Sequence, residues 1–77
     1  VHVLIIPNKE IAKVSDSEES DKELLGHLLL VSKKIADKYN LSDNYRLVIN
    51  NGADAGQSVF HIHVHLLGGR GLTWPPG

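Results

Sequence analysis

The chain contains no cysteine, no methionine and a single tryptophan, and aromatic residues make up only 5% of it. Without cysteine it forms no disulfide, and any metal site would have to use histidine or carboxylate ligands. The lack of cysteine also suits a reducing compartment. No apolar run approaches the ~20 residues that a membrane-spanning helix needs.

Neither sign of charge predominates, because eight basic and nine acidic residues leave a net charge of −1. The chain therefore has no excess of positive charge with which to bind nucleic acid or an anionic membrane surface. The 77 residues, 42% of them hydrophobic, are enough for one small domain that spans residues 1–77. Because the sequence lacks methionine and starts directly in an apolar run, we expect it to be part of a longer protein.

The coarse order of elements is strand, loop, helix, strand, loop, strand and tail. Val1 to Ile6 is an apolar, partly β-branched run that Pro7 stops, which predicts a strand. A second strand is predicted from Tyr45 to Asn50, where Asn50-Asn51-Gly52 signals a turn. A third strand is predicted where histidines alternate with apolar residues near the end of the chain. These elements predict an α+β fold, in which a meandering antiparallel sheet, incomplete in this chain, is covered by one main helix.

Apolar residues recur at three- and four-residue steps after Asp21, which predicts an amphipathic helix that ends near Asn40 with a left-handed cap. Two capping boxes are possible before it, Ser15 with Glu18 and Ser20 with Glu23. Leu25 and Leu29 widen the apolar stripe. This helix therefore packs on the sheet alone, or it also meets a second subunit.

The densest chemistry lies in the segment from Ser58 to Arg70, where His61, His63 and His65 alternate with apolar residues. In a strand this period of two points all three imidazoles to one face. The other face would enter the core with Phe60, Ile62, Val64 and Leu66. We therefore expect a strand that carries a row of titratable nitrogens.

Three uses of this row are open: a metal site, phosphoryl chemistry, or a polar exposed strand face. His61 and His65 would lie roughly 13 Å apart in a strand, so all three rings could share one metal only across a bulge. An imidazole with a pKa of ~6.5 can be a neutral nucleophile while a protonated neighbour donates to phosphate. The small residues from Asn51 to Ser58 form either a simple loop or a phosphate-binding segment.

The histidine run resembles the histidine triad (HIT) signature, and its surroundings resemble the Hint branch, the nucleoside phosphoramidate hydrolases. The segments that carry this resemblance are Val3–Pro7, Leu24–Leu28, Tyr45–Asn50, Gly56–Ser58, Gly68–Arg70 and Trp74–Gly77. Together they span almost the whole chain. The resemblance implies a HIT-like fold that here lacks the family's N-terminal strands.

The resemblance also implies a reaction: hydrolysis of the P–N bond of purine nucleoside phosphoramidates, and of acyl-adenylates, without a cofactor or metal. His63 would attack phosphorus and form a covalent nucleotidyl-histidine that water hydrolyses. His65 would bind the phosphate and assist proton transfer to the leaving amine. His61 would orient the row, and His2 matches a further histidine on a neighbouring strand.

Binding residues and partners follow from the same resemblance. The phosphate would be held by His63 and His65 together with Asn50, Gly56, Gln57 and Ser58. Leu4 would line the nucleoside pocket, and Trp74 would reach the site of the other subunit in a homodimer. We read His27 and Arg70 as structural.

The implied ligands are AMP, GMP and their phosphoramidates. The implied location is the cytoplasm, with the nucleus as a second compartment. A second, non-catalytic function would use the same residues: the protein would be a purine mononucleotide sensor or a protein-interaction module.

Overall fold

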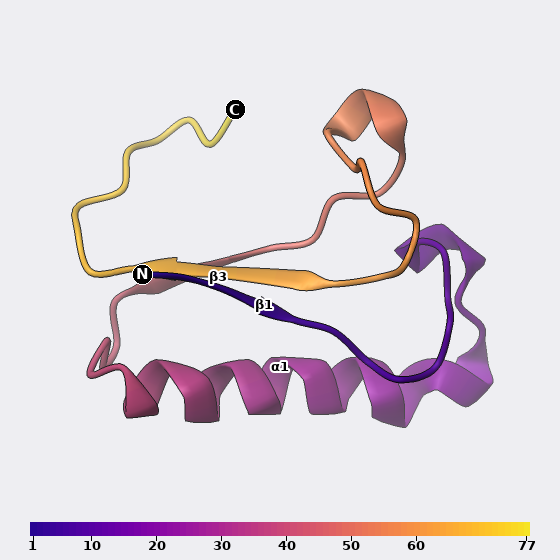
Figure 1. Cartoon of the computed structure of the whole chain (residues 1–77), viewed down its shortest axis with the longest axis horizontal. Helices are drawn as coiled ribbons and strands as arrows, with labels where there is room; N and C mark the ends of the chain where they lie inside the picture. Colours follow the sequence, from indigo (N-terminus) through magenta and orange to yellow (C-terminus); the bar gives the residue numbers. More distant parts are fainter.

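The computed structural model describes residues 1–77 and contains one helix packed along one face of a small sheet (Figure 1). The strands are β1 (His2–Ile5), β2 (Tyr45–Val48) and β3 (Val64–Gly68), and the helix is α1 (Lys22–Lys38). Three short 3-10 turns, η1 (Val14–Asp16), η2 (Glu19–Asp21) and η3 (Ala53–Ala55), lie in the connections. The predicted α+β class, with one main helix and an antiparallel sheet, is confirmed. The structure has no helix that could span a bilayer.

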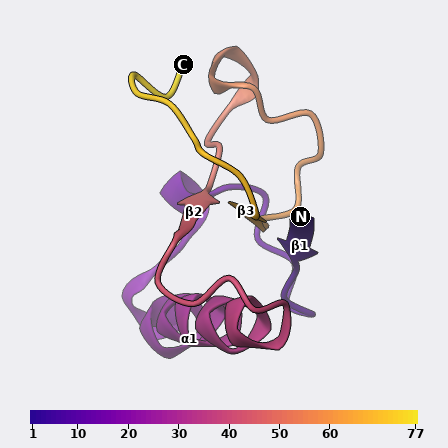
Figure 2. The same ribbon diagram turned by 90° about the vertical axis from the view of Figure 1, so that its left-hand side faces the viewer.

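The strand order is β1-β3-β2, with both outer strands antiparallel to β3. The connectivity within this chain is therefore not a meander, because β1 and β2 are consecutive strands but are not neighbours. α1 connects them along one face of the sheet (Figures 1 and 2). This order places the last strand, which carries His65, in the middle of the sheet.

The core lies between the sheet and α1. Its buried apolar residues are Ile5, Leu28, Ala36, Leu41, Val64 and Leu66. Alternate residues of β3 supply it, since Val64 and Leu66 are fully buried while His65 between them is half-buried. Ser32 is the one buried polar residue of α1, and its hydroxyl donates to the carbonyl of Leu28 at 2.7 Å. The predicted alternation along β3 therefore does set which side chains enter the core.

The predicted signals at the two ends of α1 have different outcomes. Asn40 is left-handed at φ 58°, and Leu41 N–H donates back to the carbonyl of Ala36 at 2.9 Å, so the predicted cap is confirmed. The two predicted capping boxes do not form. Glu18 and Asp21 make one instead, around η2.

The strands are shorter than predicted. β1 lacks Val1 and Ile6, and β2 ends two residues before Asn50. β3 begins only at Val64, because its ladder partners end at Ile5 and Val48. Residues before Val64 thus have no neighbouring strand on either side.

The segment before β3 therefore departs from the predicted strand. His61 and His63 precede β3, and Phe60 is exposed rather than in the core. Ile62 is nevertheless buried, and its N–H donates to the carbonyl of Ile11 at 2.7 Å. A loop, rather than a strand, supports this part of the histidine run.

The face of the sheet opposite α1 has no helix on it (Figures 1 and 2). We call it the open face. Its strand residues, read from the register, are His2, Leu4, Arg46, Val48, His65 and Leu67. The loop that carries η3 and the C-terminal tail both rise on this side of the sheet.

Candidate functional site

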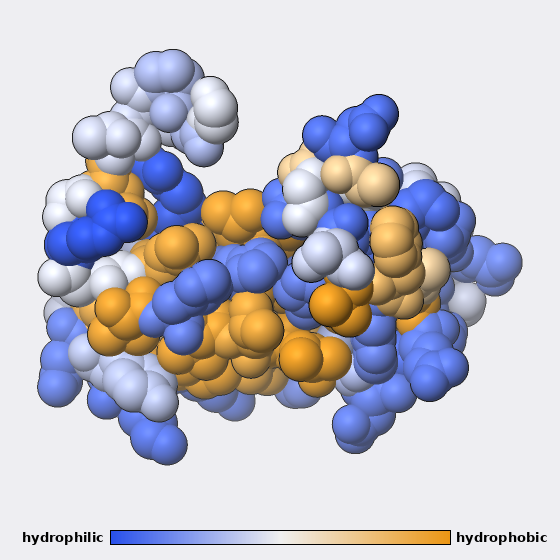
Figure 3. All heavy atoms as spheres, turned by 45° about the horizontal axis from the view of Figure 1, so that its top comes forward, coloured by the Kyte–Doolittle hydropathy of each residue, from blue (hydrophilic) through white to orange (hydrophobic).

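The open face brings together histidines from both ends of the sequence. His65 lies opposite Leu4 on β1 and Val48 on β2, and His2 lies opposite Leu67 one row away. Residues directly opposite each other in an antiparallel pair point to the same side of the sheet. Figure 3 shows this side as a depression between the tail and the η3 loop, with apolar side chains in its floor.

His2 and His65 form a direct pair, with 2.8 Å between Nε2 of His2 and Nδ1 of His65. One nitrogen must donate and the other accept, so the two atoms share one proton. Burial lowers the pKa of His65 below its usual 6.5, and the neighbouring charges of His63 and His2 lower it further. His65 is therefore the less favourable place for a positive charge.

A main-chain carbonyl determines which nitrogen of the His63 ring carries the proton. Its Nδ1 lies 2.7 Å from the carbonyl oxygen of His61, and a carbonyl can only accept. Nδ1 therefore carries the proton, and Nε2 of the neutral ring keeps its lone pair. The His63 ring meets that of His65 edge-on, with 4.9 Å between centroids. A ring nitrogen with a free lone pair and a pair of rings that share a proton thus lie side by side.

The ring of His61 is engaged elsewhere. Its Nε2 donates to the carbonyl of Pro7 at 2.9 Å, which fixes this ring to the segment after β1. His61 therefore acts on His63 through its carbonyl. In place of the predicted row of three imidazoles on one strand face, the structure has a cluster of His2, His63 and His65, with the His61 ring bonded away from it.

The η3 loop contains the predicted phosphate-binding residues. Gly52 and Gly56 have φ of 95° and 102°, where L side chains are strained. A Cβ at Gly56 would lie 3.8 Å from Nδ2 of Asn50, so the Asn50 amide lies against this glycine. Gly56 N–H donates to the carbonyl of Ala53 at 3.0 Å. It is therefore already paired within the turn.

Donors are left on two of the four predicted residues. The hydroxyl and N–H of Ser58 and the side-chain amide of Asn50 make no hydrogen bond within the chain, and Ser58 is exposed. Gln57, by contrast, is buried, and its side-chain amide bonds only to the protein. The donors of this loop that are free to meet a ligand are therefore those of Ser58 and Asn50.

The two residues predicted for the nucleoside and partner sites differ in their surroundings. Leu4 lies opposite His65 in the register and is half exposed, as a residue in the floor of a pocket would be. Trp74 is 78% exposed and stands in the tail, where the Arg46 guanidinium lies 5.8 Å from its ring centroid. Trp74 makes no aromatic contact with a histidine.

Sequence reasoning missed Arg46. This half-buried cation stands on the open face and has no carboxylate partner. It donates to the carbonyl of Thr73 at 3.0 Å, and so holds the tail. The signal was a single basic residue inside the otherwise apolar run Tyr45–Ile49.

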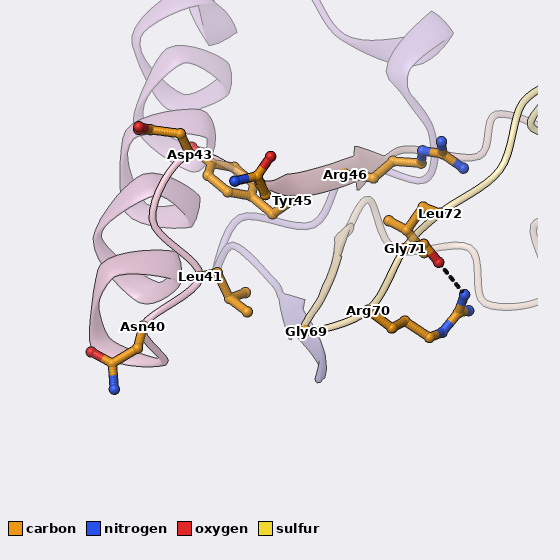
Figure 4. A pocket seen from close by; sticks show the side chains of 10 residues that line it. Asn40, Leu41, Asp43, Tyr45, Arg46, Gly69, Arg70, Gly71 and Leu72 are labelled. Atoms are coloured by element: carbon orange, nitrogen blue, oxygen red, sulfur yellow. Dashed lines mark hydrogen bonds between the residues drawn. The ribbon is translucent and has the colours of Figure 1, made fainter.

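A cavity of about 580 Å³ lies elsewhere (Figure 4). It opens at the end of the molecule, where the turn after α1 meets the start of the tail, and no histidine lines it. Arg46 and Arg70 do, the latter bonded to the carbonyl of Gly71. The cluster of His2, His63 and His65 is on the open face, so we place the candidate site there.

No three histidine or carboxylate side chains are grouped as metal ligands would be. His27 lies exposed on α1, as expected for a residue outside the site.

Comparison with known proteins gives a consistent result. A family model described as the HIT domain matches residues 1–72. An uncharacterised HIT-like protein of Synechocystis is 54% identical over all 77 residues, which cover 68% of that protein. A HIT family hydrolase from Legionella pneumophila is 53% identical, with a TM-score of 0.96 over 99% of this chain and 69% of its own. A histidine triad nucleotide-binding protein from Candida albicans is 34% identical, with a TM-score of 0.76 over 96% of this chain and 59% of its own.

Proposed function

This chain belongs to the HIT domain family, and from that premise we propose that it hydrolyses the P–N bond of purine nucleoside phosphoramidates, and acyl-adenylates, on its open face. One observation carries the proposal: the carbonyl of His61 holds the proton of His63 on Nδ1 and leaves Nε2 free to attack. Similar proteins are named as HIT family hydrolases and as a nucleotide-binding protein, which supports a nucleotide ligand such as AMP or GMP.

In the first step, Nε2 of His63 attacks phosphorus and the P–N bond breaks. The His63 ring becomes positive, and the carbonyl of His61 stabilises its Nδ1 proton. The donors of Ser58 and Asn50 would hold the phosphate oxygens while charge moves onto the leaving nitrogen.

The departing nitrogen needs a proton, and the pair of His2 and His65 can deliver it. When the pair carries one extra proton, His65 gives its Nε2 proton to the amine while the Nε2 proton of His2 crosses 2.8 Å to Nδ1 of His65. Both rings are then neutral. The lowered pKa of His65 favours this direction of transfer.

In the second step, water attacks phosphorus and the bond to Nε2 of His63 breaks, which releases the nucleoside monophosphate. His65 Nε2 accepts the proton of the water, and its Nδ1 proton returns to His2. The histidines are thereby restored to their starting state.

Phosphorus NMR of the protein with adenosine 5′-phosphoramidate tests this proposal. We expect AMP release by the wild type and a loss of at least ~10³-fold in His63→Ala, because the nucleophile is gone. His27→Ala, a histidine exposed on α1, is the matched control and should keep full activity.

If the wild type binds AMP without turnover, the proposal is wrong, and the alternative of a nucleotide sensor replaces it. A homodimer is also part of the proposal. Its support is Leu29 and Leu30 of α1, which are 48% and 62% exposed, and sedimentation velocity that finds only monomer would refute it.

A further inference from the structure

Gln57 is the most completely bonded side chain near the site. It is only 4% exposed. Its Oε1 accepts from the N–H of Gly52 at 2.8 Å, and its Nε2 donates to the carbonyls of Ala12 at 2.7 Å and Val59 at 3.1 Å. Because one N–H and two carbonyls surround the side-chain amide of Gln57, its oxygen and nitrogen can be placed in only one way. The two carbonyls use both hydrogens of the amide nitrogen.

These bonds close the loop that carries the phosphate donors. The main-chain N–H of Gln57 also donates to the carbonyl of Gly52, at 3.1 Å. Two bonds thus join residues 52 and 57, the ends of the η3 turn. The bond to Val59 fixes the chain on the far side of Ser58, so Gln57 holds both sides of the exposed Ser58.

The same side chain joins this loop to a distant segment. The same distant segment makes two further hydrogen bonds beside the bond to Ala12. Ile62 N–H donates to the carbonyl of Ile11, and Ser15 N–H donates to Oδ1 of Asn51 at 2.8 Å. Residues 11–15 thereby brace the loop and the histidine segment, neither of which belongs to the sheet there. Gln57 is the only side chain that bonds to both sides of this junction.

We infer that Gln57 is a positioning residue, which sets the η3 loop so that the Ser58 and Asn50 donors meet the phosphate, and that it does not itself contact the nucleotide. The inference rests on the proposed function. It differs from what the resemblance implies for this position, because a buried amide with both hydrogens used has no donor left for a ligand.

The test compares Gln57→Met with wild type in the full chain. Methionine fills a similar volume but makes none of the three bonds. We expect the Kd for AMP by calorimetry, and the KM for adenosine 5′-phosphoramidate, to rise roughly tenfold. The kcat should change less, because the contacts of His63 and His65 are made elsewhere. Amide exchange at Gly52 should become faster, since its N–H loses its partner.

Ser32→Ala is the matched control, because it removes a buried hydrogen bond inside α1, away from the site. It should lower stability and leave the AMP affinity unchanged. If Gln57→Met binds AMP as well as wild type, or if exchange at Gly52 stays slow, the positioning role is wrong. If the wild type itself neither binds nor hydrolyses, the proposed function has failed, and the phosphate role of this loop with it.

Gln57→Glu covers the case in which the methionine variant does not fold. An ionised carboxylate would face two carbonyls and repel them, whereas the protonated acid can donate to one. We therefore expect the AMP affinity of this variant, relative to wild type at each pH, to recover as pH falls and the introduced carboxyl group becomes protonated. A ratio that does not change with pH would overturn the inference.

Discussion

At the scale of the residue, main-chain carbonyls decide the chemistry of the histidines. Identical side chains receive different states because they meet different partners: His63 faces the carbonyl of His61, His61 faces that of Pro7, and His65 faces the ring of His2. Imidazole is suited to such assignment because either nitrogen can hold its proton. The local partners thus fix which nitrogen of His63 and of His61 carries the proton, which is the assignment that the proposed mechanism uses.

The lowered pKa of His65 makes a prediction about stability. In the pH range between its folded pKa and the usual 6.5, the unfolded chain binds more protons than the folded one, so stability rises with pH. The contribution of His65 is complete above 6.5 and is lost as pH falls through that value toward the folded pKa. We expect this contribution to be below about 1 kcal/mol, because the ring keeps contact with solvent.

Urea unfolding between about pH 7.5 and about pH 5.5 measures this effect. His65→Asn should flatten the dependence of the unfolding free energy on pH, and the exposed His27→Asn should not. An equal slope in wild type and His65→Asn would show that neither burial nor the neighbouring charges disfavour the charged form of His65.

At the scale of the element, the sequence pattern predicts burial better than it predicts hydrogen bonding. Alternation from Ile62 to Leu66 correctly assigns the core residues, yet only Val64 onward is a strand. A strand needs a neighbour, and no local pattern reveals that β1 and β2 end where they do. The brace from residues 11–15 was unpredictable for the same reason, because its bonds join segments about 45 residues apart, as between Ala12 and Gln57.

The glycine that ends β3 allows a prediction about packing. A Cβ at Gly68 would lie 2.8 Å and 3.0 Å from the two methyl carbons of Leu41, and 3.3 Å from the carbonyl oxygen of Asn44. The Leu41 side chain is buried, and the Asn44 oxygen belongs to the main chain, so neither can move freely. We expect Gly68→Ala to cost about 1–3 kcal/mol of unfolding free energy.

Gly26 is the matched control, because it lies exposed in α1 with no atom within 4 Å of an added Cβ. Gly26→Ala should stabilise by about 0.5–1 kcal/mol, since alanine loses less backbone entropy in a helix. Thermal unfolding of both variants checks the pair. Equal shifts would mean that Leu41 repacks around the new methyl group.

At the scale of the whole molecule, the site is built from a rigid floor and two attachments. The floor is the open face of the sheet, which α1 supports from below (Figure 2). The η3 loop is tied down at several points through Gln57 and its neighbours. The tail, by contrast, is held beyond Leu72 chiefly by Arg46, which bonds Thr73 and lies against Trp74. We therefore expect the two attachments to differ in mobility.

Arg46→Met tests how the tail is held. A cation over an exposed aromatic ring contributes only about 0.5–1 kcal/mol, so the loss of one side chain should release the tail. Trp74 is the only tryptophan, and its fluorescence anisotropy reports the tail directly. We expect the anisotropy to fall in Arg46→Met and to stay near the wild-type value in Arg70→Met, because Arg70 bonds only the carbonyl of Gly71. An equal fall in both variants would mean that positive charge in general, rather than the contacts of Arg46, holds the tail over the open face.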